Sequence, residues 1–269
     1  MQFPRSGGRS KAAGMTTRGI AFWVILVAAS LMGPPAVARA AAPFRSDKLA
    51  EMDAAIAAAV AAHSCPGGVL WFERGGVRYH KAYGKRALVP IEEGMTENTI
   101  FDAASLTKVV ATTPAVMLLV ERGRVSLDAP VARYLPEFTG DGREKVTVRH
   151  LLTHTSGLRP GISAGSAWSG YERGIELACA EKPTAPPGSA FRYSDVNFIL
   201  LGEIVRRVSG KKLNEFAERE IYRPLKMVDT GFLPSRLKLS RIAPTEKETN
   251  VVLRGVVHDP TARRMGGVA

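Results

Sequence analysis

A serine and a lysine at the start of an apolar helix are the residues of this chain whose spacing best suits catalysis. The segment FDAASLTK, residues 101–108, contains Ser105 and Lys108. Side chains three residues apart share one face of a helix and come within hydrogen-bond reach. A serine becomes nucleophilic when a neighbour takes its proton. A lysine can take that proton where burial or nearby positive charge favours the neutral form of the lysine. The pair therefore indicates a covalent serine hydrolase of the Ser-x-x-Lys type.

Two further pairs in the chain have the same spacing: Ser209/Lys212 and Ser235/Lys238. A glycine follows the first serine, which is typical of a helix end with solvated lysines. A proline precedes the second serine in a polar stretch, where we expect a surface loop. Only Ser105 precedes a long apolar run, residues 109–120, which would bury Lys108. The alternative at Ser105 is an ordinary helix start with a serine cap and an exposed lysine.

A second candidate element is the segment FRYSDVN, residues 191–197. Tyr193 lies in a predicted turn just before a helix, where its hydroxyl can point into a cleft. Near a lysine, a tyrosine can act as a phenolate base. Asp195 can then hydrogen-bond substrate or Lys108. The alternative is a core tyrosine, with Asp195 as a helix cap.

Periodicity and turn signals predict the elements that must position these residues. An alanine-rich helix is expected over residues 47–63, and a hairpin of strands 67–74 and 77–83 turns at Gly75-Gly76. The helix from Ser105 should run to about residue 122 and kink near Pro114. Four more helices are expected, over residues 146–155, 171–180, 197–208 and 213–221, and strand-like segments follow from residue 241, notably 250–257.

This order of elements predicts a sheet with flanking helices, split by a helical insertion. Because two strands do not form a stable sheet alone, further strands are expected from the C-terminal part. The predicted sheet-containing domain comprises residues 41–123 and 233–269, and the helical subdomain comprises residues 124–232.

Residues 1–40 have the pattern of a secretory signal peptide. They hold five basic residues and no acid, a short apolar run over 20–32, and small residues at the cleavage positions in Ala38-Arg39-Ala40. Met15 is an alternative start. The competing interpretation is an uncleaved membrane anchor, for which the run is short. We expect an exported protein, periplasmic or secreted.

Composition excludes some classes of function. The 269 residues are 45% apolar, which supports a globular core, and the net charge is +12. Without residues 1–40, the remaining 32 basic and 25 acidic residues give a net charge of +7. The remaining basic residues are scattered along the sequence. No long basic helix or aromatic-basic pattern is present, so a nucleic-acid partner is not expected.

Two other sequence features contain potentially reactive groups. Cys65 and Cys179 give no disulfide framework, and we expect both to be free and buried. The segment GISAG, residues 161–165, matches a nucleophile elbow but lies in a Gly/Ser-rich loop rather than between a strand and a helix. Neither feature is expected to carry catalysis.

Histidines offer two weaker candidates. His150 and His154 have the spacing of zinc ligands but lack the intervening glutamate and a third ligand, so helix-end histidines are expected. His258-Asp259 suggests part of a serine triad. Adjacent residues cannot easily relay to each other and to a distant serine, so loop structure is expected there.

Taken together, the Ser-x-x-Lys pair and the later Tyr-Ser-Asp segment resemble the β-lactamase-related serine hydrolases. That family includes class C β-lactamases, D-alanyl-D-alanine carboxypeptidases and esterases. Further similar segments occur in the family's order, over residues 66–69, 101–113, 150–158 and 193–210. The resemblance covers roughly residues 47–269. It implies an α+β fold of the β-lactamase/transpeptidase type, with an antiparallel sheet flanked by helices and a helical subdomain.

By position, the resemblance implies roles for four residues. Ser105 would be the acylated nucleophile, Lys108 its activating partner, and Tyr193 the general base and acid. Asp195 would bind substrate where the penicillin-recognising enzymes have an asparagine. An ionised aspartate only accepts hydrogen bonds, whereas an asparagine also donates. This difference argues against true β-lactamase activity and leaves carboxypeptidase or esterase chemistry open.

The family's third motif, Lys/His-x-Gly on a strand beside the site, is not found in this sequence. Because the chain stops at Ala269, where similar proteins continue into that strand, we expect a C-terminally truncated chain with an incomplete sheet. Loss of one oxyanion donor typically costs a factor of about a hundred to a thousand in rate.

The sequence thus predicts an exported serine hydrolase that acts through an acyl-enzyme on peptidoglycan D-Ala-D-Ala peptides, β-lactams or small esters. No metal or organic cofactor is implied. The expected partners are a small molecule or a peptidoglycan peptide, with a membrane only through an uncleaved anchor, and the chain is expected to be a monomer. The alternative is a non-catalytic cell-envelope protein that binds or senses such peptides, or an inactive fragment.

Overall fold

The computed structural model of this chain describes residues 43–165 and 167–268. The chain divides into two units, Met1–Arg45 and Ser46–Ala269, and every helix and strand below belongs to the second. The signal peptide predicted over residues 1–40 lies outside the described residues.

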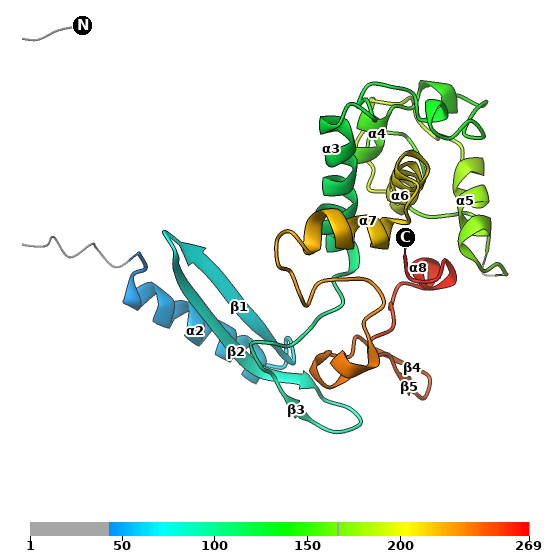
Figure 1. The fold of residues 1–269 in the computed structure, drawn as a ribbon. Coiled ribbons are helices and arrows are strands. Elements are labelled where there is room, and N and C mark those ends of the chain that lie inside the picture. Colours follow the sequence, from blue (N-terminus) through cyan, green and yellow to red (C-terminus); the bar gives the residue numbers. More distant parts are fainter. Residues whose placement is uncertain (1–42, 166, 269) are drawn as a thin grey trace, which may run out of the picture. The chain divides into compact units, whose positions relative to one another are not determined.

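A helix and a hairpin open the second unit (Figure 1). Helix α2 (Ser46–Ala61) precedes strands β1 (Gly67–Arg74) and β2 (Val77–Ala87), which pair antiparallel as predicted. Gly75 and Gly76 both have positive φ, 57° and 77°. Two such residues form the tight turn whose twist matches that of the flanking strands.

A single carboxylate ties helix α2 to the hairpin. Asp53 accepts hydrogen bonds from Tyr79 and Lys81, each at 2.6 Å, and from Tyr83. The Lys81 ammonium, with the two tyrosine hydroxyls, lowers the pKa of Asp53 to about 2. No residue of α2 is fully buried, and this polar contact links the helix to β2.

The sheet gains its third strand from an unexpected place. Strand β3 (Glu93–Gly94) pairs antiparallel with β2, while β4 (Lys247–Glu248) and β5 (Val251–Val252) pair only with each other. The prediction that strands after residue 241 extend the first sheet is therefore wrong for the described residues. Thr249, with a φ of 53°, reverses the chain so that the two short segments pair locally.

The C-terminal segment is nevertheless bound to the first part of the chain. Ile100 and Ile242 form an isolated parallel bridge. Arg254 also donates to Glu93 of β3 at 2.6 Å and 3.1 Å. Arg254, with Arg86, lowers the pKa of Glu93 to about 2, so this ion pair persists over the ordinary pH range.

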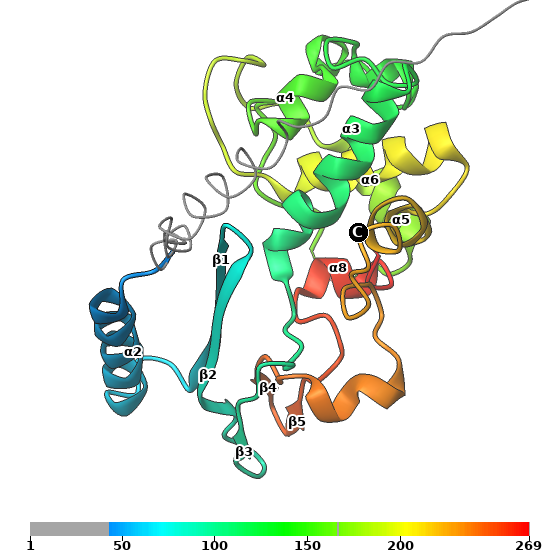
Figure 2. The same ribbon diagram turned by 60° about the vertical axis from the view of Figure 1, so that its left-hand side comes forward.

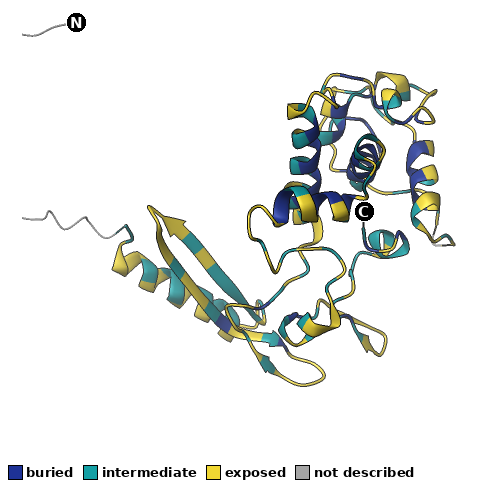
Figure 3. Ribbon diagram, viewed as in Figure 1, coloured by how far each residue is buried: buried dark blue, intermediate teal, exposed yellow. Residues whose placement is uncertain are grey.

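Helix α6 (Asp195–Ser209) lies at the centre of the helical part. It contacts α3 (Thr113–Glu121), α4 (Val148–Leu152), α5 (Tyr171–Ala180) and α7 (Leu213–Ala217), which surround it in Figure 1. Every residue from 196 to 205 is buried, and Figure 3 shows the helix dark blue over that stretch. A helix buried on all sides needs apolar residues all round, and residues 196–205 of α6 meet that requirement except at Asn197 and Glu203.

The predicted helices are present, and most of them have shifted ends. Helix α5 has the predicted bounds, and α6 begins two residues earlier than predicted. Helix α4 is shorter, and α7 passes into a π-helical turn at Glu218–Tyr222. The described elements between residues 124 and 232 are helices and helical turns. The division into a sheet domain and a helical subdomain stays a prediction.

The segment that begins at Ser105 is not one regular helix. Ala104–Leu106 forms a 3-10 turn, Lys108–Thr112 forms a π-helical turn, and α3 begins only at Thr113. Pro114 provides the reason, because a proline has no N–H to donate within an α-helix and its ring crowds the preceding turn. The irregularity predicted near Pro114 thus takes the form of a wider turn before it. Such turns are frequent at functional sites.

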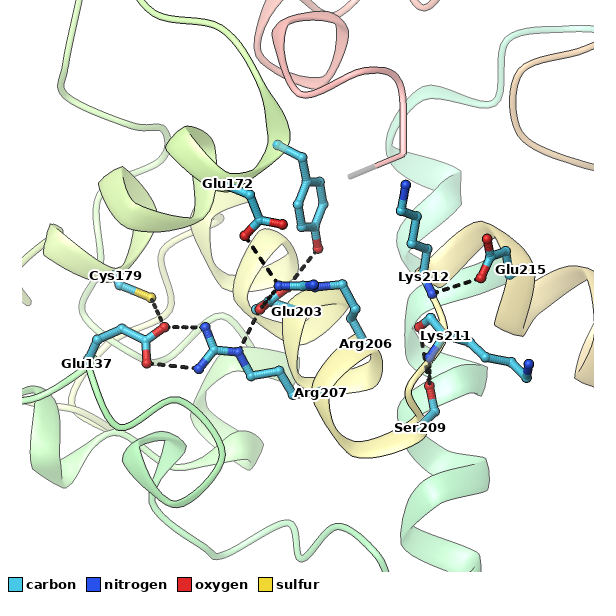
Figure 4. A network of polar contacts seen from close by, with 11 residues as sticks. Glu137, Glu172, Cys179, Glu203, Arg206, Arg207, Ser209, Lys211, Lys212 and Glu215 are labelled. Carbon is cyan, nitrogen blue, oxygen red and sulfur yellow. Dashed lines mark hydrogen bonds and ion pairs between the residues drawn. The ribbon is translucent and has the colours of Figure 1, made fainter.

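A buried carboxylate organises the last turns of α6 (Figure 4). Glu203 is fully buried and accepts hydrogen bonds from Arg206, Arg207 and the Tyr171 hydroxyl at 2.7–2.9 Å. Arg207 also donates to Glu137. Burial by itself raises the pKa of Glu203, but Arg206, Arg207 and Tyr171 lower it by more, so the pKa lies below its ordinary value.

Replacement of this carboxylate should change how stability depends on pH. A folded-state pKa below the unfolded value contributes stability above the unfolded pKa, and this contribution is lost as pH falls through the folded value. Glu203→Gln should therefore lower the free energy of unfolding by about 1–3 kcal/mol near neutral pH, with a smaller loss in acid. Denaturant unfolding at both pH values measures this.

The control for this experiment is Glu172→Gln, because the Glu172 side chain is 71% exposed. It should change stability little at either pH. A loss for Glu203→Gln that is equally large in acid and at neutral pH would contradict the assigned role of the charge.

Candidate active site

The structure brings Ser105, Lys108 and Asp195 into direct contact. The Lys108 ammonium donates to Ser105 Oγ at 3.1 Å and to Asp195 Oδ1 at 2.7 Å. Asp195 is the first residue of α6, 87 positions further along the chain than Lys108. The predicted alternative for Ser105, a simple cap beside an exposed lysine, does not describe this geometry, because the Lys108 side chain is only 13% exposed.

The charge state of Lys108 differs from the simplest expectation. Burial lowers the pKa of Lys108, but Asp195 and then Tyr193 raise it by more, and the net direction is upward. Lys108 therefore stays protonated in this state and acts as a hydrogen-bond donor. A raised pKa works against the neutral lysine that was expected to take the serine proton, and the role of Lys108 in activating Ser105 stays a prediction.

Tyr193 lies over the same ammonium group. Its ring centroid is 4.8 Å from Lys108 Nζ, and the ring of Phe198 is 5.7 Å away. A cation at this distance is attracted to the face of an aromatic ring. Tyr193 is 43% exposed, so the alternative of a core tyrosine is wrong.

The turn that presents Ser105 is held by Asp102, a residue with no role predicted from the sequence. Asp102 accepts the Ala104 N–H at 2.9 Å, and Ala104 has a φ of 46°, in the left-handed region. Non-glycine residues seldom adopt this conformation, and it tends to persist where surrounding contacts impose it. An aspartate two residues before a tight turn is the sequence signal for such a bond.

Asp102 also anchors the C-terminal segment. His258 donates its backbone N–H to Asp102 at 3.1 Å and places Nδ1 at 3.2 Å from the same carboxylate. Figure 2 shows the segment between β5 and α8 (Pro260–Arg264) beside the turn that leads to α3. Burial raises the pKa of Asp102, but the backbone N–H groups of Ala104 and His258 outweigh it and keep the pKa below its ordinary value.

His258 and Asp259 therefore have separate partners. Asp259 caps α8 by accepting the Ala262 N–H at 2.7 Å and does not pair with His258. Loop structure was predicted for both residues, and their sequence gave no sign that His258 reaches the nucleophile segment. That contact depends on an aspartate 156 positions away.

A large cleft opens beside these residues. Its volume is about 1020 Å³, and Ser105, Lys108, Asp195, Asp102 and His258 are among the residues that line it. Tyr193 does not line this cleft, but its ring lies 4.8 Å from the ammonium of Lys108, which does line it. The cleft has room for a peptide-sized or drug-sized molecule.

The other Ser-x-x-Lys pairs have no comparable geometry. Ser209 Oγ accepts the backbone N–H of Lys211 at a helix end, and Figure 4 shows the Lys212 side chain extended away from it. Lys238 donates to the backbone carbonyl of Val228 rather than to Ser235. Both were predicted to be ordinary surface features.

The remaining candidates also have structural roles. Ser163 of the elbow-like segment donates to Glu181 from both its N–H and its hydroxyl, at 2.6 Å. His150 Nδ1 accepts the Thr147 N–H and caps α4. Within residues 43–165 and 167–268, no three His, Cys, Asp or Glu residues are grouped to hold a metal.

The two cysteines are free, as predicted. Cys179 is buried, and burial, followed by the nearby Glu137, raises the pKa of its thiol to about 12. Cys65 is only partly buried, so the prediction of burial holds for one of the two.

The described fold is shared with solved structures of a class C β-lactamase and of a hydrolase. A class C β-lactamase structure matches 77% of this chain and 57% of its own, with a TM-score of 0.66 and 25% identity. A hydrolase with promiscuous acyltransferase activity, EstCE1, matches with a TM-score of 0.66 and 23% identity over 82% of this chain and 68% of its own. The predicted α+β, β-lactamase-like fold class is thereby confirmed.

The sequence comparisons give the family. The beta-lactamase family model matches residues 52–268, and the chain belongs to that family. The N-acetylmuramyl-L-alanine amidase of Bacillus subtilis (strain 168) is 32% identical over 88% of this chain and 58% of its own. A putative D-alanyl-D-alanine carboxypeptidase of Escherichia coli (strain K12) is 33% identical over 68% and 45%. Esterase EstB of Burkholderia gladioli is 39% identical over 59% and 45%, so the chain spans about half the length of these relatives.

The contact between Asp195 and Lys108 predicts a measurable shift. Asp195→Asn removes the charge that raises the pKa of Lys108 but keeps an oxygen that can accept its hydrogen bond. The pKa of Lys108 should therefore fall relative to the wild-type chain. An NMR titration of the lysine side chains, assigned with Lys108→Arg, measures it.

The matched control is Asp128→Asn, which removes an exposed carboxylate paired with Arg149. It should leave the titration of Lys108 unchanged. A Lys108 titration that does not move in Asp195→Asn would contradict the assigned ion pair.

Proposed function

We propose that this chain belongs to an exported serine hydrolase that acts through an acyl-enzyme on amide or ester bonds. The observation that carries the proposal is the chain of contacts from Ser105 Oγ through the Lys108 ammonium to Asp195, at 3.1 Å and 2.7 Å. It lies beside a cleft of about 1020 Å³. A serine held by a cation in a cleft suits attack on a carbonyl carbon.

In the proposed acylation step, Ser105 Oγ forms a bond to the substrate carbonyl carbon. Tyr193, as a phenolate, takes the serine proton and then passes it to the leaving amine or alcohol when the carbon–leaving-group bond breaks. Because Lys108 stays protonated, its role is to orient Ser105 Oγ and to stabilise negative charge on Tyr193. Water then enters, and the reverse proton path releases the acyl group and restores Ser105.

The proposed substrate class follows from Asp195 and from the relatives. The Asp195 side chain is 48% exposed, and its Oδ1 is engaged by Lys108. The lone pairs of this carboxylate that Lys108 does not use can only accept hydrogen bonds. This favours a substrate with an N–H or O–H group near the scissile bond. The relatives carry the names of a carboxypeptidase, an amidase and an esterase, which supports peptidoglycan peptides and small esters as substrates.

Export is part of the same proposal. The basic and apolar pattern of residues 1–40 supports secretion to the periplasm or the medium, where peptidoglycan is accessible. A positive net charge is compatible with anionic cell-envelope material.

Covalent labelling tests the nucleophile. The full chain treated with a fluorescent fluorophosphonate should be labelled, and Ser105→Ala should abolish the label because no other serine shares this geometry in the described part of the chain. Mass spectrometry locates the modified residue.

The decoy pairs supply matched controls. Ser209→Ala and Ser235→Ala should leave labelling intact. Label that survives Ser105→Ala, or a wild-type chain that takes none, would overturn the proposal. Label from a penicillin that is never released would instead favour a non-catalytic binding or sensor protein.

A further inference from the structure

The segment that carries Tyr193 has no regular secondary structure, yet its backbone is fixed on both sides by one residue. The Arg192 N–H donates to the His154 carbonyl at 2.8 Å. The Ser194 N–H donates to His154 Nδ1 at 3.1 Å. The backbone N–H groups of the two residues that flank Tyr193 are thus held by the main chain and by the ring of the same histidine.

The ring of His154 also lies against the side chain of Tyr193. Their ring centroids are 4.5 Å apart at an interplanar angle of 31°. The ring of Phe198 packs on His154 at 5.0 Å, and that of Phe191 meets it edge-on at 5.9 Å. Tyr193 is therefore restrained through its ring as well as through its backbone. The Lys108 ammonium also lies near the Tyr193 ring.

His154 itself is held in one conformation. It is 9% exposed and has a φ of 56°, in the left-handed region, two residues after the end of helix α4. The Asn197 amide nitrogen lies 3.3 Å from Nδ1, and Ser156 Oγ donates to the Asn197 carbonyl oxygen at 2.6 Å. That bond directs the Asn197 amide N–H groups toward the histidine.

These donors require an acceptor at Nδ1, so the ring carries its proton on Nε2. A protonated imidazolium would have no lone pair for the Ser194 N–H. Burial lowers the pKa of His154, the Lys108 charge lowers it further, and the Asp195 charge opposes them; the net direction is downward. The ring thus stays neutral and remains an acceptor.

We infer that His154 is a positioning residue for Tyr193: it holds the tyrosine over Lys108 by accepting hydrogen bonds from both sides of it and by packing under its ring. This inference rests on the proposed role of Tyr193 in proton transfer. His154 itself does not touch the nucleophile or line the cleft. A displacement of a reacting group by about 1 Å can cost roughly a hundredfold in rate, so the restraint has a kinetic consequence.

The test compares two substitutions. His154→Ala removes the ring and the Nδ1 acceptor, whereas His154→Asn keeps a side-chain oxygen near the Nδ1 position and tolerates a positive φ. We expect His154→Ala to lower the limiting rate of fluorophosphonate labelling of Ser105 by about 10–100-fold with little change in the half-saturating probe concentration. His154→Asn should recover a measurable part of that loss. Circular dichroism and thermal unfolding establish that each variant is folded.

A double-mutant cycle separates positioning from general stability. If His154 acts through Tyr193, His154→Ala should slow the Tyr193→Phe variant far less than it slows the wild-type chain. Equal slowing in both backgrounds, or a wild-type rate in His154→Ala, would overturn the inference.

A second readout does not depend on catalysis. In protein labelled with carbon-13 in its tyrosine rings, His154→Ala should shift and broaden the Tyr193 resonance, and His154→Asn should do so less. A Tyr193 resonance unchanged in His154→Ala would refute the positioning role whatever the labelling result. A wild-type chain that takes no label would refute the proposed function alone, because the NMR comparison still decides the position of Tyr193.

Discussion

The ion pair between Lys108 and Asp195 is the contact on which the candidate site depends. It joins the segment that presents Ser105 to the first residue of α6, two parts of the chain that meet only through folding. A largely buried ammonium needs a counter-charge, because an unpaired charge is costly to remove from water. The pair therefore fixes the site and sets the protonation of Lys108 at the same time, and this is why the lysine acts as a donor toward Ser105.

Helix α6 connects this site to the rest of the helical part. Its first turn provides Asp195, and its last turns carry Glu203 and its arginine partners (Figure 4). The stretch between them is buried by the surrounding helices. A closely packed core resists rotation or sliding of the helix, so the packing of α6 restrains the position of its first residue, Asp195. The core of the helical part thus contributes to function by fixing the direction of α6.

The loops around the site are restrained by polar contacts in addition to packing. Asp102 binds Ala104 and His258, and His154 binds the residues on both sides of Tyr193. Ala104 and His154 both have positive φ, which is rare without glycine. Each strained residue thus lies next to a predicted catalytic residue and is stabilised by a hydrogen bond. Strain of this kind is common where a side chain must be aimed accurately.

The sequence by itself determined several local elements and predicted the residues of the candidate site. The hairpin at Gly75-Gly76, helix α5 and the irregular turn near Pro114 follow from short-range rules of turn geometry and missing N–H groups. The choice of Ser105 over Ser209 and Ser235 also followed from neighbouring residues. The resemblance of several segments to one family predicted the fold class and singled out Tyr193 and Asp195.

Only the tertiary structure decided which groups from distant parts of the chain bind the same carboxylate or the same cation. Three contacts join segments that are far apart in the sequence. Asp195 pairs with Lys108, His258 donates to Asp102, and His154 accepts from the backbone beside Tyr193. The protonation of Lys108 and the pairing of β4 with β5 depend likewise on such contacts. Local propensity and periodicity depend on residues that are near one another in the sequence. The contacts between separated segments and the protonation of Lys108 depend instead on packing and charge pairing across the fold.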